Sequence, residues 1–564
     1  MSLFGSIRMA NNTLQAQQIG LQVVGQNIAN VNTPGYIREE VIFEPAPAQR
    51  QGNIILGLGV RVAGVVQKID KFLEDRLRGS SSDAANSDVQ QQTYLELERL
   101  LGELGENDLS TSLNAFFSSI SEVLNQPENS AIRNLAVLQG QTLTDDIGRL
   151  AEQVATARND VNDQIISSAD DINRLTKEIF DFNRQIAIFE SSDISESDAV
   201  GLRDQRNQAI IELAELIDIQ AVEQPSGAVN ISINGEFIVN EVARRELTVV
   251  ETTDRGQPVA EIQFVETGSV PGFTSGRVAG LFTSRDEVLA EFLDELDSFS
   301  AALAFEFNRV HSSGQGLLGY QELTGEFRIE ETDEPLDAAG LSFAPENGSL
   351  QVLVRNLDTG VTETTDIFID LDGLDTDTTY DDFLAALNGV DGLTASTTSD
   401  ARITLAADAG LEFSFANDTS GLLAALGLNT FFEGDSARTI GIRQELIDDA
   451  RLLAASGGGI GEDTDNAVLL ADFANRELDS ANGSSVDSLY RNLSSSVTQA
   501  TAVARSIAEG DQVFMQSLES QRFATSGVNL DDEIVRMISY QRAYQAAARY
   551  IAEINELLEI LVSI

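Results

Sequence analysis

Few side chains in this sequence are of the types that do chemistry. The chain has no cysteine and one histidine, His311, whereas aspartate and glutamate make up 90 of its 564 residues. Without cysteine there is neither a disulfide framework nor a thiol nucleophile. A metal or proton-relay site at His311 would need partner residues that the sequence does not suggest, so we predict a satisfied histidine on the surface or at a helix end.

The segment that looks most like a metal site is Asp370-Leu-Asp-Gly-Leu-Asp-Thr-Asp377. Calcium ions take clustered carboxylates as ligands, which makes the segment worth testing. The EF-hand spacing fails, because Leu374 stands at the fifth ligand position and Asp375 stands where glycine is required. We therefore favour a solvated turn between a strand and a helix, and we expect no metal and no cofactor.

Motifs for catalysis are absent from the sequence. It has no nucleophile elbow, no phosphate-binding loop and no set of zinc ligands. A glycosidase uses a pair of carboxylates, but in a chain with 90 acidic residues the presence of such pairs does not distinguish a glycosidase from other proteins. The sequence thus gives no reason to propose an enzyme.

Composition narrows the classes of partner. The formal net charge is -54 and only Lys68, Lys71 and Lys177 are lysines, so the chain would repel the phosphates of nucleic acid. The sequence contains no apolar run of 18 residues that could span a bilayer, and no cleavable signal opens it. Without a membrane span or a cleavable signal, the sequence predicts a cytoplasmic protein. This prediction holds only if proteins leave the cell by the general secretory route alone. The length predicts three or four domains.

The last stretch of the chain carries an apolar repeat with alternating steps of four and three residues. This heptad spacing is typical of a helix that buries one seam against a partner helix. Two seam positions, Gln541 and Asn555, are polar, and a buried amide at such a position fixes register and partner number. The repeat consists of Leu530, Ile534, Met537, Gln541, Tyr544, Ala548, Ile551, Asn555, Leu558 and Val562.

The first stretch shows the same alternation, so we predict that the two termini pair as a two-helix rod. Arg8 is the only charged residue from Met1 to Asn32, and ten of these 32 residues are Asn or Gln. Such a polar but nearly uncharged surface suits contacts with copies of the chain, and we expect the pair to become ordered on assembly. The seam consists of Leu3, Ile7, Ala10, Leu14, Gln17, Leu21, Val24, Ile28 and Val31.

Between the termini the period of the apolar residues changes several times. One helical seam runs from Leu143 to Phe189, and a period of two takes over from 222 to 276, with Asn234-Gly235 as a hairpin turn. Residues 326–435 hold 23 acidic residues against three arginines, with a capping box at Thr379 and Asp382.

These changes predict an α+β multidomain chain with paired terminal helices, an elongated helical bundle and β-rich outer inserts. The predicted division is a terminal assembly domain (1–40 and 526–564), a helical rod domain (41–221, 277–320 and 436–525), a small β subdomain (222–276) and an acidic insert (326–435).

A helix stop follows the first seam and carries the most specific string in the sequence. Pro34 and Gly35 end the helix on physical grounds. The string Asn27-Ile-Ala-Asn-Val-Asn-Thr-Pro-Gly-Tyr36 resembles the signature of the axial proteins of the bacterial flagellum, the family of rod, hook and hook-associated proteins. Ser526-Gly-Val-Asn-Leu-Asp-Asp-Glu533 and Tyr540-Gln-Arg-Ala-Tyr-Gln-Ala546 resemble the other end of that family, in the form found at the hook–filament junction. The motif residues at the first site are Asn27, Asn30, Asn32, Thr33, Pro34, Gly35 and Tyr36.

The resemblance implies a structural protein that assembles through its terminal helices outside the cell, after export without a cleavable signal. It implies four partners: the chain itself, the hook protein, the second junction protein (hook-associated protein 3) and a cytoplasmic export chaperone at the C-terminal region. The implied assembly interface consists of Leu3, Ile7, Leu14, Leu21, Val24, Ile28, Leu530, Ile534, Met537, Gln541, Tyr544, Ile551, Asn555 and Leu558.

Three alternatives stay open at this point. Another axial component is the nearest, although the Asn-Thr-Pro-Gly string disfavours the second hook-associated protein and the long central helix disfavours a hook protein. An acidic coiled-coil adhesin would need a secretion signal or an anchor. A salt-adapted acidic enzyme would need a convergent catalytic cluster.

Overall fold

A computed structural model describes residues 3–33, 35–51, 54–102, 108–190, 199–374, 376–461, 463–481 and 483–563. The fold is α+β and multidomain, with a long helix at each end of the chain and several small antiparallel sheets. Two compact units are present: unit 1 comprises residues 1–92, 160–285 and 503–564, and unit 2 comprises 93–159 and 286–502. The finer division into four domains remains a prediction.

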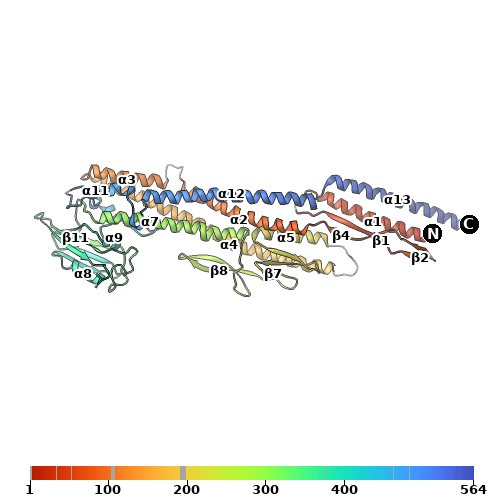
Figure 1. Ribbon diagram of the computed structural model, residues 1–564, viewed down its shortest axis with the longest axis horizontal. Coiled ribbons are helices and arrows are strands. Elements are labelled where there is room, and N and C mark those ends of the chain that lie inside the picture. The colour runs from red at the N-terminus through yellow and green to blue at the C-terminus, as the bar shows by residue number, and fades with distance from the viewer. Residues whose placement is uncertain are drawn as a thin grey trace. The chain divides into compact units, whose positions relative to one another are not determined.

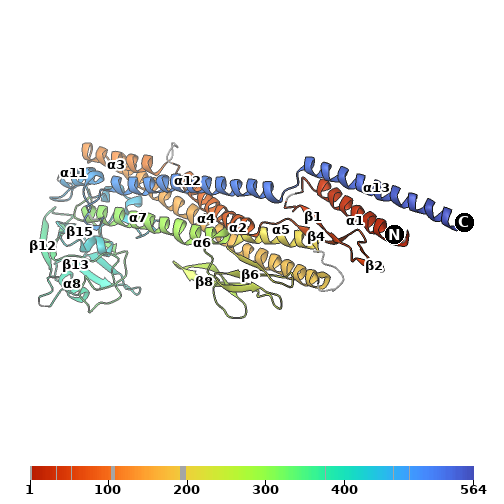
Figure 2. The ribbon, with the colours of Figure 1, turned by 45° about the vertical axis from the view of Figure 1, so that its right-hand side comes forward.

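Unit 1 contains the paired terminal helices. Helix α1 (Leu3–Ala29) lies beside α13 (Leu530–Ser563), as both ribbon views show (Figures 1 and 2). The other side of α1 packs on an antiparallel pair formed by β1 (Glu39–Pro45) and β4 (Val60–Gln67). A short hairpin of β2 (Gln49–Gln51) and β3 (Ile54–Leu56) lies between these strands in sequence. The pairing of the termini that the heptads predicted is therefore present in a single chain.

The longest helix, α4 (Ser130–Glu190), has 61 residues and contributes to both units. Its predicted seam is confirmed for most of its length, since Leu143, Ile147, Ile165, Ile172 and Ile179 are fully buried. The predicted end was wrong in detail: Phe189 is exposed because it occupies the last turn. Helices α2 (Lys71–Leu101) and α12 (Val486–Ser526) also have residues in both units.

Two small sheets complete unit 1 together with α5 (Val200–Leu216) and α6 (Gly276–Thr283). The predicted hairpin turn is confirmed, because Asn234 and Gly235 both have positive φ, at 46° and 85°, between β6 and β7. The first sheet consists of β5 (Gln220–Glu223), β6 (Val229–Ile233) and β7 (Glu236–Val239); the second consists of β8 (Leu247–Asp254) and β9 (Gln257–Phe264).

Unit 2 has an aromatic core. Phe116 of α3 (Leu109–Asn125) contacts Phe307 of α7 (Leu289–Ser312), with ring centroids 5.4 Å apart, and both rings also contact Phe431 and Phe432. A π-helical turn, Ser284–Val288, precedes α7. The remaining short elements near this core are β16 (Phe432–Glu433), β17 (Gly441–Ile442), α10 (Gln444–Asp448) and α11 (Asp465–Asp472).

The acidic segment folds as two three-stranded sheets with their own apolar core. One sheet has the order β12-β11-β15 and the other the order β10-β14-β13. The predicted capping box is confirmed at the start of α8 (Tyr380–Leu387), where Thr379 and Asp382 bond each other's backbone. The other elements are β10 (Glu322–Thr324), β11 (Gly348–Asn356), β12 (Thr362–Ile369), β13 (Leu393–Thr397), β14 (Ile403–Ala407), β15 (Leu411–Ala416) and α9 (Leu422–Leu426).

His311 lies in the last turn of α7 and is fully buried, so of the two predicted positions the helix end is confirmed and the surface is wrong. Its Nδ1 lies 2.8 Å from the carbonyl oxygen of Asn429, and its Nε2 accepts a hydrogen bond from the backbone N–H of Ala454. Burial lowers its pKa to about 4. The ring is thus a neutral, satisfied link between backbone segments.

Candidate functional site

The chain turns sharply after α1, at the residues of the first motif. Asn30 donates to the carbonyl of Gln26 and accepts from the hydroxyl of Thr33 at 3.1 Å. Gly35 has φ of +75°, and a Cβ there would lie 2.6 Å from the Oε1 atom of Gln208. Glycine is therefore needed for its conformation and for space. Pro34 of the motif lies outside the described residues, and Asn32 is exposed.

Asn27 explains why an amide stands at the start of this motif. Its side chain is 1% exposed and forms hydrogen bonds at both ends. The Nδ2 group donates to the carbonyl of Glu39 at 3.0 Å and to the carboxylate of Glu533 at 3.1 Å. The Oδ1 atom accepts from the N–H of Glu39 and from the hydroxyl of Tyr36. A buried group of this kind fixes the strand β1 against the end of α1.

Glu533 carries this network across to the start of α13. The guanidinium of Arg38 donates to Glu533 with Nε at 2.8 Å, and the ion pair is almost completely buried. The backbone N–H of Arg38 also donates to the carbonyl of Ser526. The two strings that carry the family resemblance, one at each end of the sequence, therefore meet in a single hydrogen-bonded network.

A close approach between the helices follows further along α1. Tyr540 lies against Gly20, where an added Cβ would come within 3.0 Å of two ring carbons. The same ring packs edge-on against Phe43 of β1, with centroids 5.9 Å apart. Tyr540 thus fills the space between α1, α13 and the strand pair, and Gly20 allows the helices to approach.

The predicted interface residues divide by burial in the single chain. Val24 is buried, whereas Leu530, Ile534 and Tyr544 are exposed. The half-buried ones are Ile7, Leu14, Leu21, Ile28, Met537, Ile551 and Leu558. The side chain of Leu3 lies outside the described set. The two seam amides, Gln541 and Asn555, are exposed, so one chain by itself does not bury them.

The observed contact stripes differ from strict heptads for a physical reason. Helix α1 has two neighbours, α13 and the strand pair, so its buried stripe is broad and includes Ala16, Gly20 and Val23. Helix α13 has α1 on one side, and its most buried positions are Glu533, Ala547 and Ile554. Much of its remaining apolar surface is exposed: Val535, Ile538, Tyr550, Leu557 and Ile560 add to the exposed residues named above.

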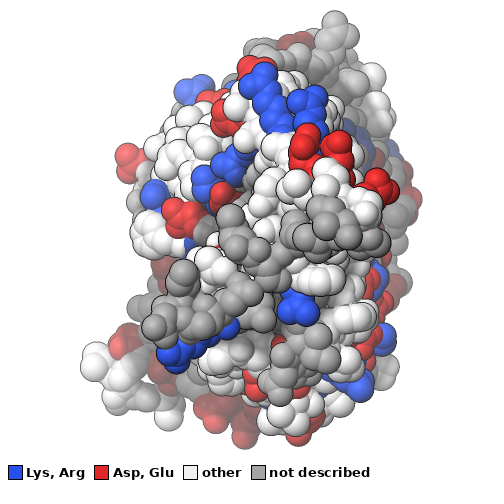
Figure 3. Space-filling model, turned by 90° about the vertical axis from the view of Figure 1, so that its right-hand side faces the viewer, with Lys and Arg blue, Asp and Glu red and all other residues white. Residues whose placement is uncertain are grey.

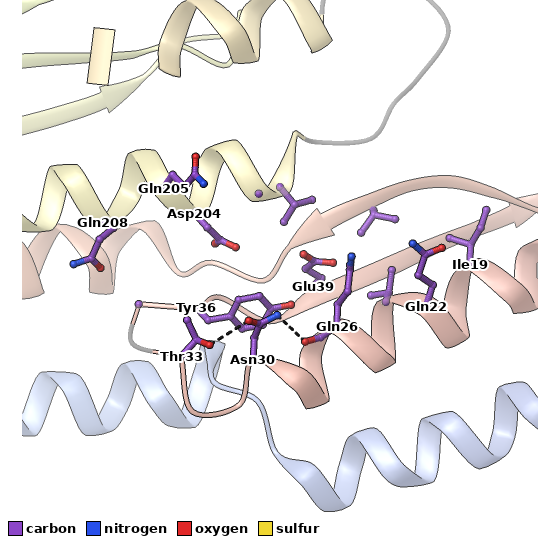
Figure 4. Close-up of a pocket in the computed structure, with 15 residues that line it drawn as sticks. Ile19, Gln22, Gln26, Asn30, Thr33, Tyr36, Glu39, Asp204, Gln205 and Gln208 are labelled. Atoms are coloured by element: carbon purple, nitrogen blue, oxygen red, sulfur yellow. Dashed lines mark hydrogen bonds between the residues drawn. The ribbon is translucent and has the colours of Figure 1, made fainter. Parts of the chain in front are cut away.

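A pocket of about 630 Å³ lies beside this network, between α1, the turn after it and α5 (Figure 4). Amide side chains dominate its polar lining, namely Gln22, Gln26, Asn30, Gln205 and Gln208. Two acids also line it, Glu39 from β1 and Asp204 from α5. No lysine or arginine is among its described lining residues.

The acids of the pocket have unusual proton affinities. Burial and the nearby charge of Glu39 raise the pKa of Asp204 to about 7. Hydrogen bonds from the Ile37 N–H and the Gln67 side chain lower this pKa, but their effect is smaller. Burial also raises the pKa of Glu39. For Tyr36, burial and the neighbouring acids raise the pKa of the phenol. The pocket is thus a partly desolvated, acidic, amide-lined recess.

The described residues give little support to other kinds of site. Asp370, Asp372 and Asp377 bring carboxylate oxygens within 4.8 Å of one another, but Asp370 and Asp372 are exposed and the group lies in a turn between β12 and α8. Among the described helices, none combines the length and apolarity required to cross a membrane. Figure 3 shows the face towards the chain termini, where positive and negative side chains are interspersed with uncharged ones.

Sequence reasoning did not assign roles to Arg38, Gly20 or Asp204, although it quoted Glu533 and Tyr540 within the motifs. Arg38 is two residues beyond Tyr36 and carries a cation next to a helix stop, a signal that could have pointed to a buried ion pair. Asp204 gave no signal, because the residues that enclose it from α1, β1 and β4 lie more than a hundred positions away in the sequence.

Three family models match separate parts of the chain. The model described as "Flagellar hook-associated protein FlgK helical domain" matches residues 94–327. "Flagella basal body rod protein" matches 7–36, and "Flagellar basal body rod FlgEFG protein C-terminal" matches 519–564. The two terminal matches contain the residues of the buried network, apart from Arg38 and Glu39.

Individual proteins give the same result. Flagellar hook-associated protein 1 of Salmonella typhimurium is 26% identical over 99% of this chain and 99% of its own length. The flagellar basal-body rod protein FlgC of Borreliella burgdorferi is 30% identical over its full length, covering 25% of this chain. The solved structure of the flagellar hook junction protein FlgK from Burkholderia pseudomallei matches with a TM-score of 0.50 and 14% identity, over 80% of this chain and 100% of that one. This last likeness supports the fold.

Proposed function

Because the chain belongs to the family of flagellar axial proteins, we propose that it forms part of the junction between hook and filament, assembling through its terminal helices. The observation that carries the proposal is the buried network at Asn27, Arg38 and Glu533. It joins the two terminal segments that match flagellar families into one body, which is thereby available as a unit for assembly. The role is structural rather than catalytic.

The exposed apolar residues of α13 support assembly at this end of the chain. Leu530, Ile534, Val535 and Ile538 are each more than 40% exposed within a single helix. Contiguous apolar surface of this kind marks interaction sites on soluble proteins. We infer that neighbouring axial subunits cover it: other copies of this chain, the hook protein below and hook-associated protein 3 above. A cytoplasmic chaperone would cover the same C-terminal region before export.

Full-length similarity to a hook-associated protein 1 favours a role at the hook–filament junction over the alternative functions. A hook protein, a second hook-associated protein or an adhesin would not be expected to align from end to end with that relative. The central match to the helical domain of the same protein points the same way.

Binding to isolated hooks tests the proposal. Ile534→Asp places a charge in the inferred interface, and we expect the bound fraction in a pelleting assay to fall at least tenfold, because burying an isoleucine is worth about 1.5–3 kcal/mol and the charge adds a desolvation cost. Phe368→Asp is the matched control, since Phe368 is 77% exposed on the acidic sheet. Equal binding of both variants and the unaltered chain would contradict assembly through α13.

Hydrogen exchange adds a second readout. We expect amides of residues 3–33 and 530–563 to exchange faster in the free chain than on hooks, while buried amides of α4 are protected in both. Termini that are already maximally protected in a dilute monomer would show that no assembly-linked ordering takes place.

A further inference from the structure

Among the described residues that line the acidic pocket beside the terminal helices, none is a lysine or an arginine. Asp204 and Glu39 both face a partly desolvated recess, where a carboxylate is costly unless it is paired. A cation whose charge acts on Asp204 is Arg522, which is held by Glu74 at 2.8 Å and by the carbonyl of Gly35. Arg522 is therefore committed elsewhere.

The lining suits one kind of cation in particular. A guanidinium has five N–H donors in a planar fork, more than one carboxylate can accept. The pocket lining also includes the side-chain amides of Gln22 and Gln26 on α1 and of Gln205 on α5, which Figure 4 labels. An arginine could pair with the carboxylate and donate its remaining protons to amide oxygens. A lysine would satisfy fewer of these acceptors.

Arg8 is a cation without an acidic partner among the described residues. It is the only charged residue among the first 32, and its side chain is exposed on α1. Within the described part of the chain it makes no ion pair and no hydrogen bond. Its neighbours at three and four positions, Phe4, Gly5, Asn11 and Asn12, include no acid. An unpaired cation on a helix face rich in amides is expected where a partner supplies the charge.

Arg8 cannot reach the pocket of its own chain. The α1 residues that line the pocket begin at Ile19 and extend to the turn at Thr33. At 1.5 Å per residue, Arg8 lies about 17 Å or more away along the same helix axis, a distance that no arginine side chain spans. If Arg8 supplies the cation, the pocket that receives it must therefore belong to another molecule.

We propose that the pocket lined by Asp204, Glu39 and the surrounding amides receives the guanidinium of Arg8 from a second copy of this chain. The inference rests on the proposed function, because it specifies one contact of the assembly. The cation and the pocket lie on different parts of α1, so each copy can use both at once. Repeated head to tail, the contact builds a ring or a helical layer, as the proposed function requires, whereas a reciprocal exchange between two copies would close a dimer.

Cross-linking tests the contact directly, because the chain has no native cysteine. Arg8→Cys and Gln205→Cys proteins are mixed, assembled on hooks and treated with a short bismaleimide linker. We expect a linked dimer only in assembled material. Glu215→Cys replaces Gln205→Cys as the control, since Glu215 is exposed on α5 but does not line the pocket. Efficient linking of Arg8→Cys to position 215 but not to 205 would overturn the proposal.

A charge-removal series covers the case in which the cysteine variants assemble poorly. Arg8→Ala should lower self-association on hooks at least tenfold and Arg8→Lys by less, with no change in the melting temperature of the free chain. Arg184→Ala, at another exposed arginine, should bind as the unaltered chain does. If the unaltered chain assembles on hooks and Arg8→Ala assembles as well as Arg184→Ala, the proposed pocket contact is wrong but the junction role is unaffected. If the unaltered chain does not bind hooks, the pocket contact and the junction role are both wrong.

Discussion

At the scale of single residues, two ion pairs tie the β1 segment to α13 and differ mainly in burial. Arg38–Glu533 is at most 9% exposed, whereas Arg536–Glu40 is 38% and 45% exposed. Removing one partner of a buried pair leaves the other charge unpaired in a poorly solvated place. We expect Glu533→Ala to destabilise the terminal pair by about 3–5 kcal/mol. Glu40→Ala should cost less than about 1 kcal/mol.

The measurement is native-state hydrogen exchange of α1 amides in the free chain, which reports the opening of the terminal pair without requiring the whole chain to unfold in one step. Equal exchange rates in the two variants would mean that Glu533 contributes no more than a surface charge does.

His311 gives unit 2 a dependence on acid. Its pKa is about 4 in the folded chain and 6.5 in the reference state, so folding favours the neutral ring. This contribution to the free energy of unfolding is fully present above pH 6.5 and is lost as the pH falls towards 4. In that range the unfolded chain binds a proton at His311 and the folded chain does not. The loss amounts to about 3 kcal/mol.

The measurement is urea unfolding of the unaltered chain and of His311→Gln, which does not titrate, followed by circular dichroism between pH 7.5 and 4.5. Since this is the only histidine, the gap between the two proteins isolates its contribution. The gap should shift by about 2.5 kcal/mol in favour of the variant over this range, because pH 4.5 is still above the folded-state pKa. A gap independent of pH would show that the ring titrates alike in both states.

At the scale of elements, the spacing of α1 and α13 depends on a small residue. A Cβ at Gly20 would meet the Tyr540 ring at 3.0 Å, while a Cβ at Gly25 on the same helix meets nothing within 4 Å. Gly20→Val should therefore push the helices apart and destabilise their pairing by about 1–3 kcal/mol. Gly25→Val should be neutral or slightly stabilising, because glycine is the poorer helix former.

Hydrogen exchange of α13 amides in the two variants checks this prediction. Protection as high in Gly20→Val as in Gly25→Val would show that Tyr540 can move aside without loss.

Local pattern predicted the elements that bury a single continuous stripe. Helix α4 buries one stripe throughout, so Leu143 to Ile186 could be assigned from spacing alone. The turn at Asn234-Gly235 was predictable because both residues tolerate positive φ. The seam of α13 was predicted less well: Tyr544 is exposed and Ala547 is buried. Beyond its first turns, which also contact the β1 segment, α13 packs mainly on α1, so little else constrains which of its sides faces inward.

At the scale of the whole molecule, the candidate site was the least predictable feature. Asn27 and Glu533 are 506 positions apart, and no periodicity within either segment indicates that an amide of one will bond a carboxylate of the other. The motif strings indicated that both ends matter, but the network and the pocket arise from tertiary packing. Charge acts at this scale as well, since a net charge of -54 is a property of no single element.

Two copies of so acidic a chain repel each other on approach, and salt should relieve this repulsion. The Debye length falls from about 30 Å at 0.01 M salt to about 8 Å at 0.15 M, so distant charges are screened while contacts at the interface are screened less. One inferred Arg8–Asp204 contact per interface is attractive, but the net charge of each copy is far larger. Repulsion therefore decides the sign, and we expect assembly on hooks to become faster as NaCl rises over this range. Stopped-flow light scattering measures the rate, and sucrose at equal osmolality is the control. A rate that falls with salt would show that local attraction between Arg8 and the acidic pocket dominates the encounter.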